Sequence, residues 1–140
     1  MPGGPTPIGF VVFAGIKLAG YTAAARVLKA NYNRPDRSSW TVGAARTALG
    51  IVVGGTYGAI WIALAIYARL GDWSLIAWFA LLFPVRMAEW FIILWFFFDR
   101  ELRDRRTILR YAALGTLWSY ALDVIGMLAA AVTPFGFWIC

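Results

Sequence analysis

The stretch "FALLFPVRMAEWFIILWFFF", residues Phe79–Phe98, decides the fold of this chain. Apart from Arg86 and Glu89 it contains no charged side chain, and about 20 apolar residues suffice for a helix to cross the roughly 30 Å hydrocarbon core of a bilayer. The stretch therefore predicts a transmembrane helix. A charge at the centre of a bilayer costs at least about 2.5–3.5 kcal/mol, so two opposite charges three residues apart require an explanation.

The composition of the whole chain also indicates a membrane protein. The 140 residues are 61% hydrophobic and 14% charged, whereas soluble domains are roughly 45–50% apolar and about 25% charged. A soluble helical bundle would need a polar outer face on each helix, and we find none. We expect an all-α polytopic membrane protein that forms one domain over residues 1–140.

Four segments are long and apolar enough to cross a membrane, at about residues 8–28, 41–70, 74–98 and 108–133. The serines of "RPDRSS" (34–39) can cap the second helix. Gly71 can end that helix, and Asp72 or Ser74 can cap the third. Lys17 interrupts the first apolar stretch and no cation precedes it, which is the reverse of a signal peptide. We therefore expect the first span to remain in the mature protein.

The distribution of Lys and Arg predicts the orientation. The first connection carries Arg26, Lys29, Arg34 and Arg37, and the third carries Arg100, Arg103, Arg105 and Arg106, with Arg110 just beyond. The second connection has only Arg69, and the N-terminal segment has no cation. We expect a multi-pass protein of the cell membrane with both basic connections in the cytoplasm and both termini outside.

The remaining composition excludes several kinds of partner and cofactor. The net charge of +6 is concentrated in short connections between apolar runs, which favours contact with anionic membrane lipid over nucleic acid. Cys140 is the one cysteine, and the chain has no histidine, so the usual zinc and haem sites are ruled out. We expect neither a metal nor another cofactor.

Four ionisable residues from three spans are predicted to share one depth in the membrane: Lys17, Arg86, Glu89 and Asp123. Lys17 can pair with Asp123 while Arg86 pairs with Glu89, or Arg86 can take Asp123 and leave Glu89 to Lys17. Arg46 is placed near the cytoplasmic end of the second span. The candidate ligand- or ion-binding residues are these five together with the hydroxyls of Tyr57 and Tyr120.

Two further features bear on packing. Pro84 removes a backbone hydrogen bond just before Arg86 and can kink the helix beside the charges. Gly50, Gly54 and Gly58 repeat every four residues, which favours close helix packing within the fold or in a homodimer. Buried charge pairs can also serve only to fix how helices dock, without any ligand.

Three functions fit these features. The first is transport or binding of a small anionic or zwitterionic solute or a lipid headgroup, with Lys17 and Arg86 holding the anion. The second is an accessory or assembly subunit of a larger membrane complex. The third is an intramembrane enzyme that modifies a lipid or isoprenoid, with Glu89 or Asp123 as general acid or base. The chain contains no P-loop, GxGxxG, HExxH or GxSxG motif, so catalytic residues stay unassigned.

Overall fold

The computed structural model describes residues 7–33, 36–68, 74–102 and 104–132. Four helices follow one another, α1 (Pro7–Tyr32), α2 (Ser39–Ala68), α3 (Ser74–Phe97) and α4 (Arg105–Val132). Each contains a window long and apolar enough to span a membrane. This confirms the prediction of an all-helical chain with four candidate spans, an arrangement that fits a multi-pass membrane bundle.

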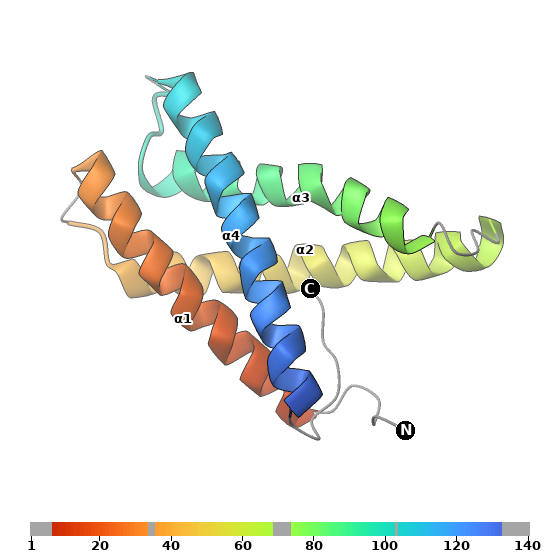
Figure 1. Ribbon diagram of the computed structural model, residues 1–140. Helices are drawn as coiled ribbons and strands as arrows, with labels where there is room; N and C mark the ends of the chain where they lie inside the picture. Colours follow the sequence, from red (N-terminus) through yellow and green to blue (C-terminus); the bar gives the residue numbers. More distant parts are fainter. Residues whose placement is uncertain (1–6, 34–35, 69–73, 103, 133–140) are drawn as a thin grey trace.

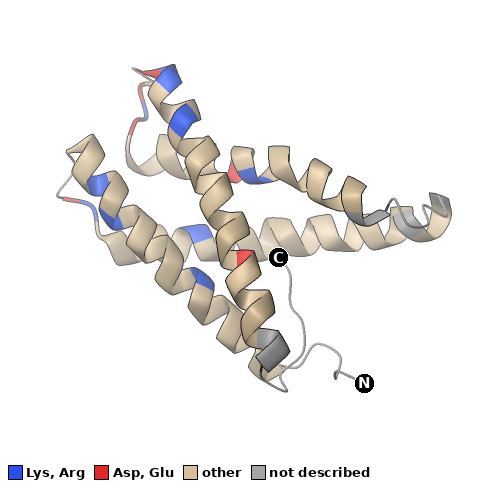
Figure 2. Cartoon of the chain, viewed as in Figure 1, with Lys and Arg blue, Asp and Glu red and all other residues tan. Residues whose placement is uncertain are grey.

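The helices are arranged in two pairs that cross: α1 and α4 form one pair, and they lie across the pair formed by α2 and α3 (Figure 1). α1 packs most extensively on α2 and α4 on α3, while α2 with α3 and α1 with α4 make smaller contacts. The second half of α2 and the first half of α3 extend away from α1 and α4 (Figure 1). The connections that follow α1 and α3 lie at the same end of the molecule, and charged residues gather there (Figure 2).

The helix ends follow local chemistry. The backbone N–H of Thr41 donates to Ser38 Oγ at 3.4 Å, so a serine caps α2 as predicted. α1 continues four residues past its predicted end and stops at Asn33, whose φ of 51° is left-handed and is tolerated by asparagine. Gly71 and Asp72, proposed to end α2 and to cap α3, lie outside the described residues.

α4 begins three residues earlier than predicted because Asp104 caps it. Asp104 Oδ1 accepts hydrogen bonds from the backbone N–H groups of Arg106 and Thr107, each at 3.1 Å. The Thr107 hydroxyl donates to Asp104 Oδ2 at 2.6 Å. These bonds satisfy donors that the first turn of a helix leaves unpaired.

Glycines mark the places where the helices approach one another most closely. A Cβ at Gly43 of α2 would lie 2.9 Å from the backbone nitrogen of Thr22 in α1, and one at Gly115 of α4 would overlap the indole of Trp90. Of the predicted stripe, a Cβ at Gly58 would meet Trp78 of the same chain at 3.6 Å. That glycine therefore packs inside the fold.

The apolar core lies between the charged residues of the helices and the two basic connections. It joins all four helices through residues that include Leu28, Val42, Leu94 and Ile108. α1 buries one residue per turn, at Gly9, Phe13, Lys17, Tyr21, Ala25 and Leu28. This spacing places Lys17 on the face of α1 that meets its neighbours.

Candidate functional site

Five charged side chains form a buried layer where the helices cross, and we call them the ionic layer: Lys17, Arg46, Arg86, Glu89 and Asp123. Their exposed fractions are 4%, 0%, 3%, 4% and 2%, respectively. Every one of the four helices contributes: Lys17 comes from α1, Arg46 from α2, Arg86 and Glu89 from α3, and Asp123 from α4. Charged residues are almost never buried to this degree unless they are paired.

Asp123 joins three helices by accepting from two cations. Lys17 Nζ lies 2.5 Å from Asp123 Oδ1, and Arg86 Nη2 lies 2.6 Å from Asp123 Oδ2. Each predicted alternative contained one of these two contacts, and both contacts form because the two carboxylate oxygens each take one donor. Glu89, which the alternatives gave to Arg86 or to Lys17, pairs with Arg46 instead. The carboxylate of Asp123 thus ties α1 and α3 to α4.

The third ion pair of the layer joins Arg46 Nη2 to Glu89 Oε2 at 2.7 Å. The sequence-based placement of Arg46 apart from the other charges was wrong. That placement counted depth along each span as if all spans were parallel, whereas α2 crosses α1 (Figure 1). The crossing brings the first third of α2 against the middle of α1, and Arg46 into the layer.

Ser119 of α4 lies at the centre of the layer. Its Oγ accepts from Trp90 Nε1 at 2.9 Å and from the Tyr21 hydroxyl at 3.2 Å, and Arg46 Nη2 lies 3.5 Å away. It donates in turn to the Gly115 carbonyl at 3.0 Å. Lys17 Nζ also donates to the backbone carbonyl of Ser119 at 3.2 Å. Ser119 therefore contacts two cations of the layer, Arg46 through its hydroxyl and Lys17 through its backbone carbonyl.

The sequence did not identify Tyr21, Trp90 or Ser119 as site residues. Tyr21 lies one helical turn from Lys17, and Ser119 lies one turn from Asp123, so both share a face with a candidate residue. Helical spacing was the available signal. Trp90 shares the charged face of α3 with Leu82, Arg86, Glu89 and Ile93, and all five are buried.

The two predicted tyrosines lie in different places. The Tyr120 hydroxyl donates to the Phe79 carbonyl at 3.0 Å, and its ring lies 5.4 Å from Arg86 Cζ, beside the ionic layer. The Tyr57 hydroxyl donates to the Trp78 carbonyl at 2.9 Å, and its ring packs against Trp61 and Trp78. Tyr57 thus belongs to the part of α2 and α3 that extends away from the other helices.

The charges of the layer do not balance. Three cations face two carboxylates, which leaves one positive charge if each group is in its usual ionised form. Desolvation of an ion costs several kcal/mol even after the protein relaxes, and only well-formed ion pairs offset it. An arrangement of this kind can hold an anion inside the bundle, and its carboxylates can accept protons.

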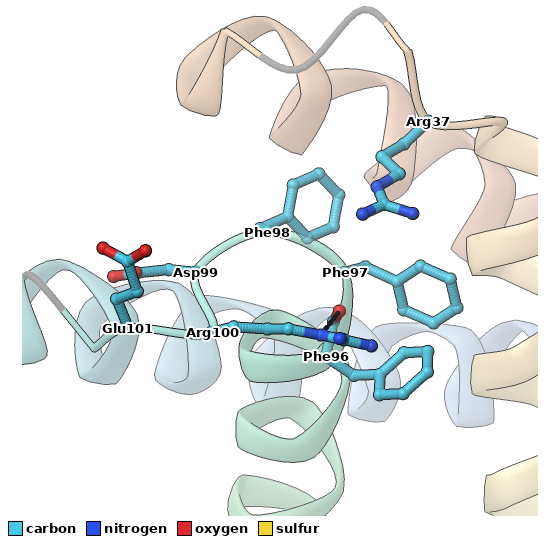
Figure 3. Close-up of a pocket in the computed structure, with 7 residues that line it drawn as sticks. All are labelled: Arg37, Phe96, Phe97, Phe98, Asp99, Arg100 and Glu101. Atoms are coloured by element: carbon cyan, nitrogen blue, oxygen red, sulfur yellow. Dashed lines mark hydrogen bonds between the residues drawn. The ribbon is translucent and has the colours of Figure 1, made fainter.

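Apart from the ionic layer, a hollow lies at the end of the molecule that carries the basic connections. It has a volume of about 160 Å³ and is lined by Arg37, Arg100 and the aromatic run Phe96–Phe98, with Asp99 and Glu101 beside them (Figure 3). Arg100 Nε donates to the Phe96 carbonyl at 3.4 Å, and Arg100 Cζ lies 4.7 Å from the Phe96 ring. Acidic neighbours offset its two cations, so this hollow lacks the excess positive charge of the ionic layer.

Comparisons with protein-family models, with curated proteins and with solved structures found no match to this chain.

Proposed function

We propose that this chain is a multi-pass protein of the cell membrane that binds a small anionic or zwitterionic solute at the ionic layer and carries it across the bilayer. The observation that carries the proposal is the layer's surplus of one cation at full burial. Intramembrane ionisable residues generally mark solute, ion or proton paths. Helix docking alone is achieved with Ser, Thr or Asn hydrogen bonds.

The roles of the residues follow from their contacts. Lys17, Arg46 and Arg86 supply positive charge for the solute, and Glu89 and Asp123 hold these cations in place through contacts of 2.5–2.7 Å. Both carboxylates are also the candidate proton carriers. A zwitterion would place its anionic group against the cations and its amine against a carboxylate.

The orientation is part of this proposal. The connections after α1 and α3, together with the helix ends that flank them, carry nine of the 13 cations, and these connections lie at one end of the molecule (Figure 2). Under the positive-inside rule that end faces the cytoplasm, where anionic lipid attracts it. Both termini then lie outside the cell.

A flux measurement in proteoliposomes tests the transport function. Purified protein is reconstituted, and uptake of chloride, phosphate, acetate and glycine is followed in the wild type and in Glu89→Gln and Asp123→Asn. We expect uptake of at least one solute, lost in both variants while their circular dichroism stays helical. Uptake that equals protein-free liposomes for all four solutes, or uptake unchanged in both variants, would contradict the proposal.

The burial of α2 favours a second candidate function, that of an assembly subunit or homo-oligomer. Only 6% of the candidate span in α2 is buried inside the chain, compared with 33%, 33% and 39% for the other three. Large apolar side chains such as Ile60, Ile62 and Ile66 are more than half exposed. Native mass spectrometry in mild detergent separates the candidates, because a fixed partner or second copy favours assembly and a ligand-competent monomer favours the first function.

A further inference from the structure

The Arg46 guanidinium combines full burial with incomplete hydrogen bonding. Its Nη2 is used by Glu89 and Ser119. Its Nε and Nη1 have no hydrogen-bond partner among the described residues, although Arg46 is 0% exposed. Buried polar groups are satisfied in the great majority of cases, so these donors call for an acceptor. The rings of Tyr21 and Trp90 cover the guanidinium at 4.8 and 5.2 Å from Cζ and leave its edge to meet that acceptor.

The neighbouring lysine does not relieve the charge. Lys17 Nζ has three acceptors, the Asp123 carboxylate at 2.5 Å, the Ser119 carbonyl at 3.2 Å and the Tyr21 hydroxyl at 3.5 Å. A protonated amine has three N–H donors, which matches this set. The ammonium donors of Lys17 are therefore all used within the layer, whereas Arg46 keeps donors without a partner.

A small cavity lies beside these groups, between α1 and α2. Its volume is about 10 Å³, and its lining includes Lys17, Tyr21, Thr47 and Gly50. A Cβ added to Gly50 would lie 3.0 Å from Arg46 Nη1, so the unsatisfied edge of the guanidinium lies at the glycine that forms the cavity wall. A cavity of about 10–15 Å³ holds roughly one water-sized species.

Resting on the proposed function, we infer that this cavity between α1 and α2 binds one water-sized monovalent anion of the halide class, which accepts from Arg46 Nη1 and is balanced by the surplus charge of the layer. Charge decides the sign of the ligand, and volume decides its size. Fluoride matches a space of one water, chloride is somewhat larger, and phosphate and carboxylates are too large. Because Gly50 has no side chain, the space beside Arg46 Nη1 stays open for the anion.

Titration of the purified protein tests the size and the place of the ligand. Protein in neutral detergent and gluconate buffer is titrated calorimetrically with fluoride, chloride, acetate and phosphate. We expect fluoride or chloride to bind at least tenfold more tightly than acetate or phosphate. Gly50→Val fills the wall beside Arg46 Nη1 and is expected to weaken halide binding at least tenfold.

Gly55→Val is the matched control, because a Cβ at Gly55 meets no atom within 4 Å, and it should bind halide as the wild type does. Tighter binding of acetate or phosphate, or unchanged halide binding in a folded Gly50→Val protein, would overturn the halide site while leaving anion binding by the layer intact. Absence of binding for all four anions would overturn both. If Gly50→Val fails to fold, the order of affinities in the wild type still decides.

Discussion

Arg46 Nη2 lies 2.7 Å from Glu89 Oε2, and this contact joins α2 to α3 at full burial of the guanidinium. Among the described residues of the ionic layer, it is the one ion pair that does not involve Asp123. Glu89 is matched by one cation and Asp123 by two, so the cation in excess of the carboxylates belongs to the contacts of Asp123.

Removing either member of this pair should destabilise the protein more than removing both. Arg46→Gln and Glu89→Gln each leave a buried charge without its partner, which costs about 3–5 kcal/mol. The double variant removes both charges, so its loss of unfolding free energy should be well below the sum. Equilibrium unfolding in mixed detergent micelles gives the free energy of unfolding for the wild type, the two single variants and the double variant.

The exposed pair Arg37–Asp36, with atoms 3.6 Å apart, provides the control cycle. Its coupling free energy should be at most about 1 kcal/mol because solvent screens it. Additive effects of Arg46→Gln and Glu89→Gln would mean that the two side chains do not act as a buried pair.

Replacement of glycine by alanine should lower the thermal stability of the protein at Gly43 of α2 but not at Gly55 of the same helix. Gly43→Ala places Cβ 2.9 Å from the backbone nitrogen of Thr22 and 3.0 Å from its Cα. Because backbone cannot rotate away, α1 and α2 must separate, and overpacking of this kind costs about 1–3 kcal/mol. Gly55→Ala meets open space and gains helix propensity. Thermal unfolding should show a lower midpoint for the first variant only, and equal midpoints would argue against this helix contact.

The stability that Asp104 contributes as the cap of α4 should depend on pH. The Thr107 hydroxyl and then the Thr107 backbone N–H donate to its carboxylate and lower the pKa of Asp104 below its ordinary value of 3.8. A carboxyl whose pKa is depressed by folding stabilises the protein above its unfolded pKa, and this contribution is lost as pH falls through the folded pKa. Asp104→Ala should therefore lower the unfolding midpoint at neutral pH, and the difference from wild type should shrink below about pH 4. A difference constant from pH 7 to pH 3 would contradict this role of the carboxylate.

The sequence was sufficient for the helices and for part of the ionic layer. Apolar run length located all four helices, and helical spacing placed Arg86 and Glu89 on one buried face of α3. Equal depth along two spans made the contact between Lys17 and Asp123 one of two alternatives, and the distance of 2.5 Å between Nζ and Oδ1 shows that it forms.

The way in which the helices cross could not be predicted from the sequence. Arg46 lies in the layer because α2 crosses α1, and crossing depends on contacts such as Gly43 against Thr22, which are distant in sequence. The predicted glycine stripe indicated close packing in α2 but gave no sign of Gly43 or Gly115. Local patterns identify which residues are buried, and tertiary packing decides which of them meet.

Halide binding by the purified protein is the decisive test of whether the ionic layer binds an anion through Arg46. Equilibrium dialysis, run once with fluoride and once with radiolabelled chloride, counts bound ions per chain. We expect one halide ion per wild-type chain and none for the double variant Arg46→Gln/Glu89→Gln, which keeps the net charge of the layer but lacks the guanidinium. Wild-type protein that binds neither halide, or a folded double variant that binds as much as the wild type, would contradict this role of Arg46.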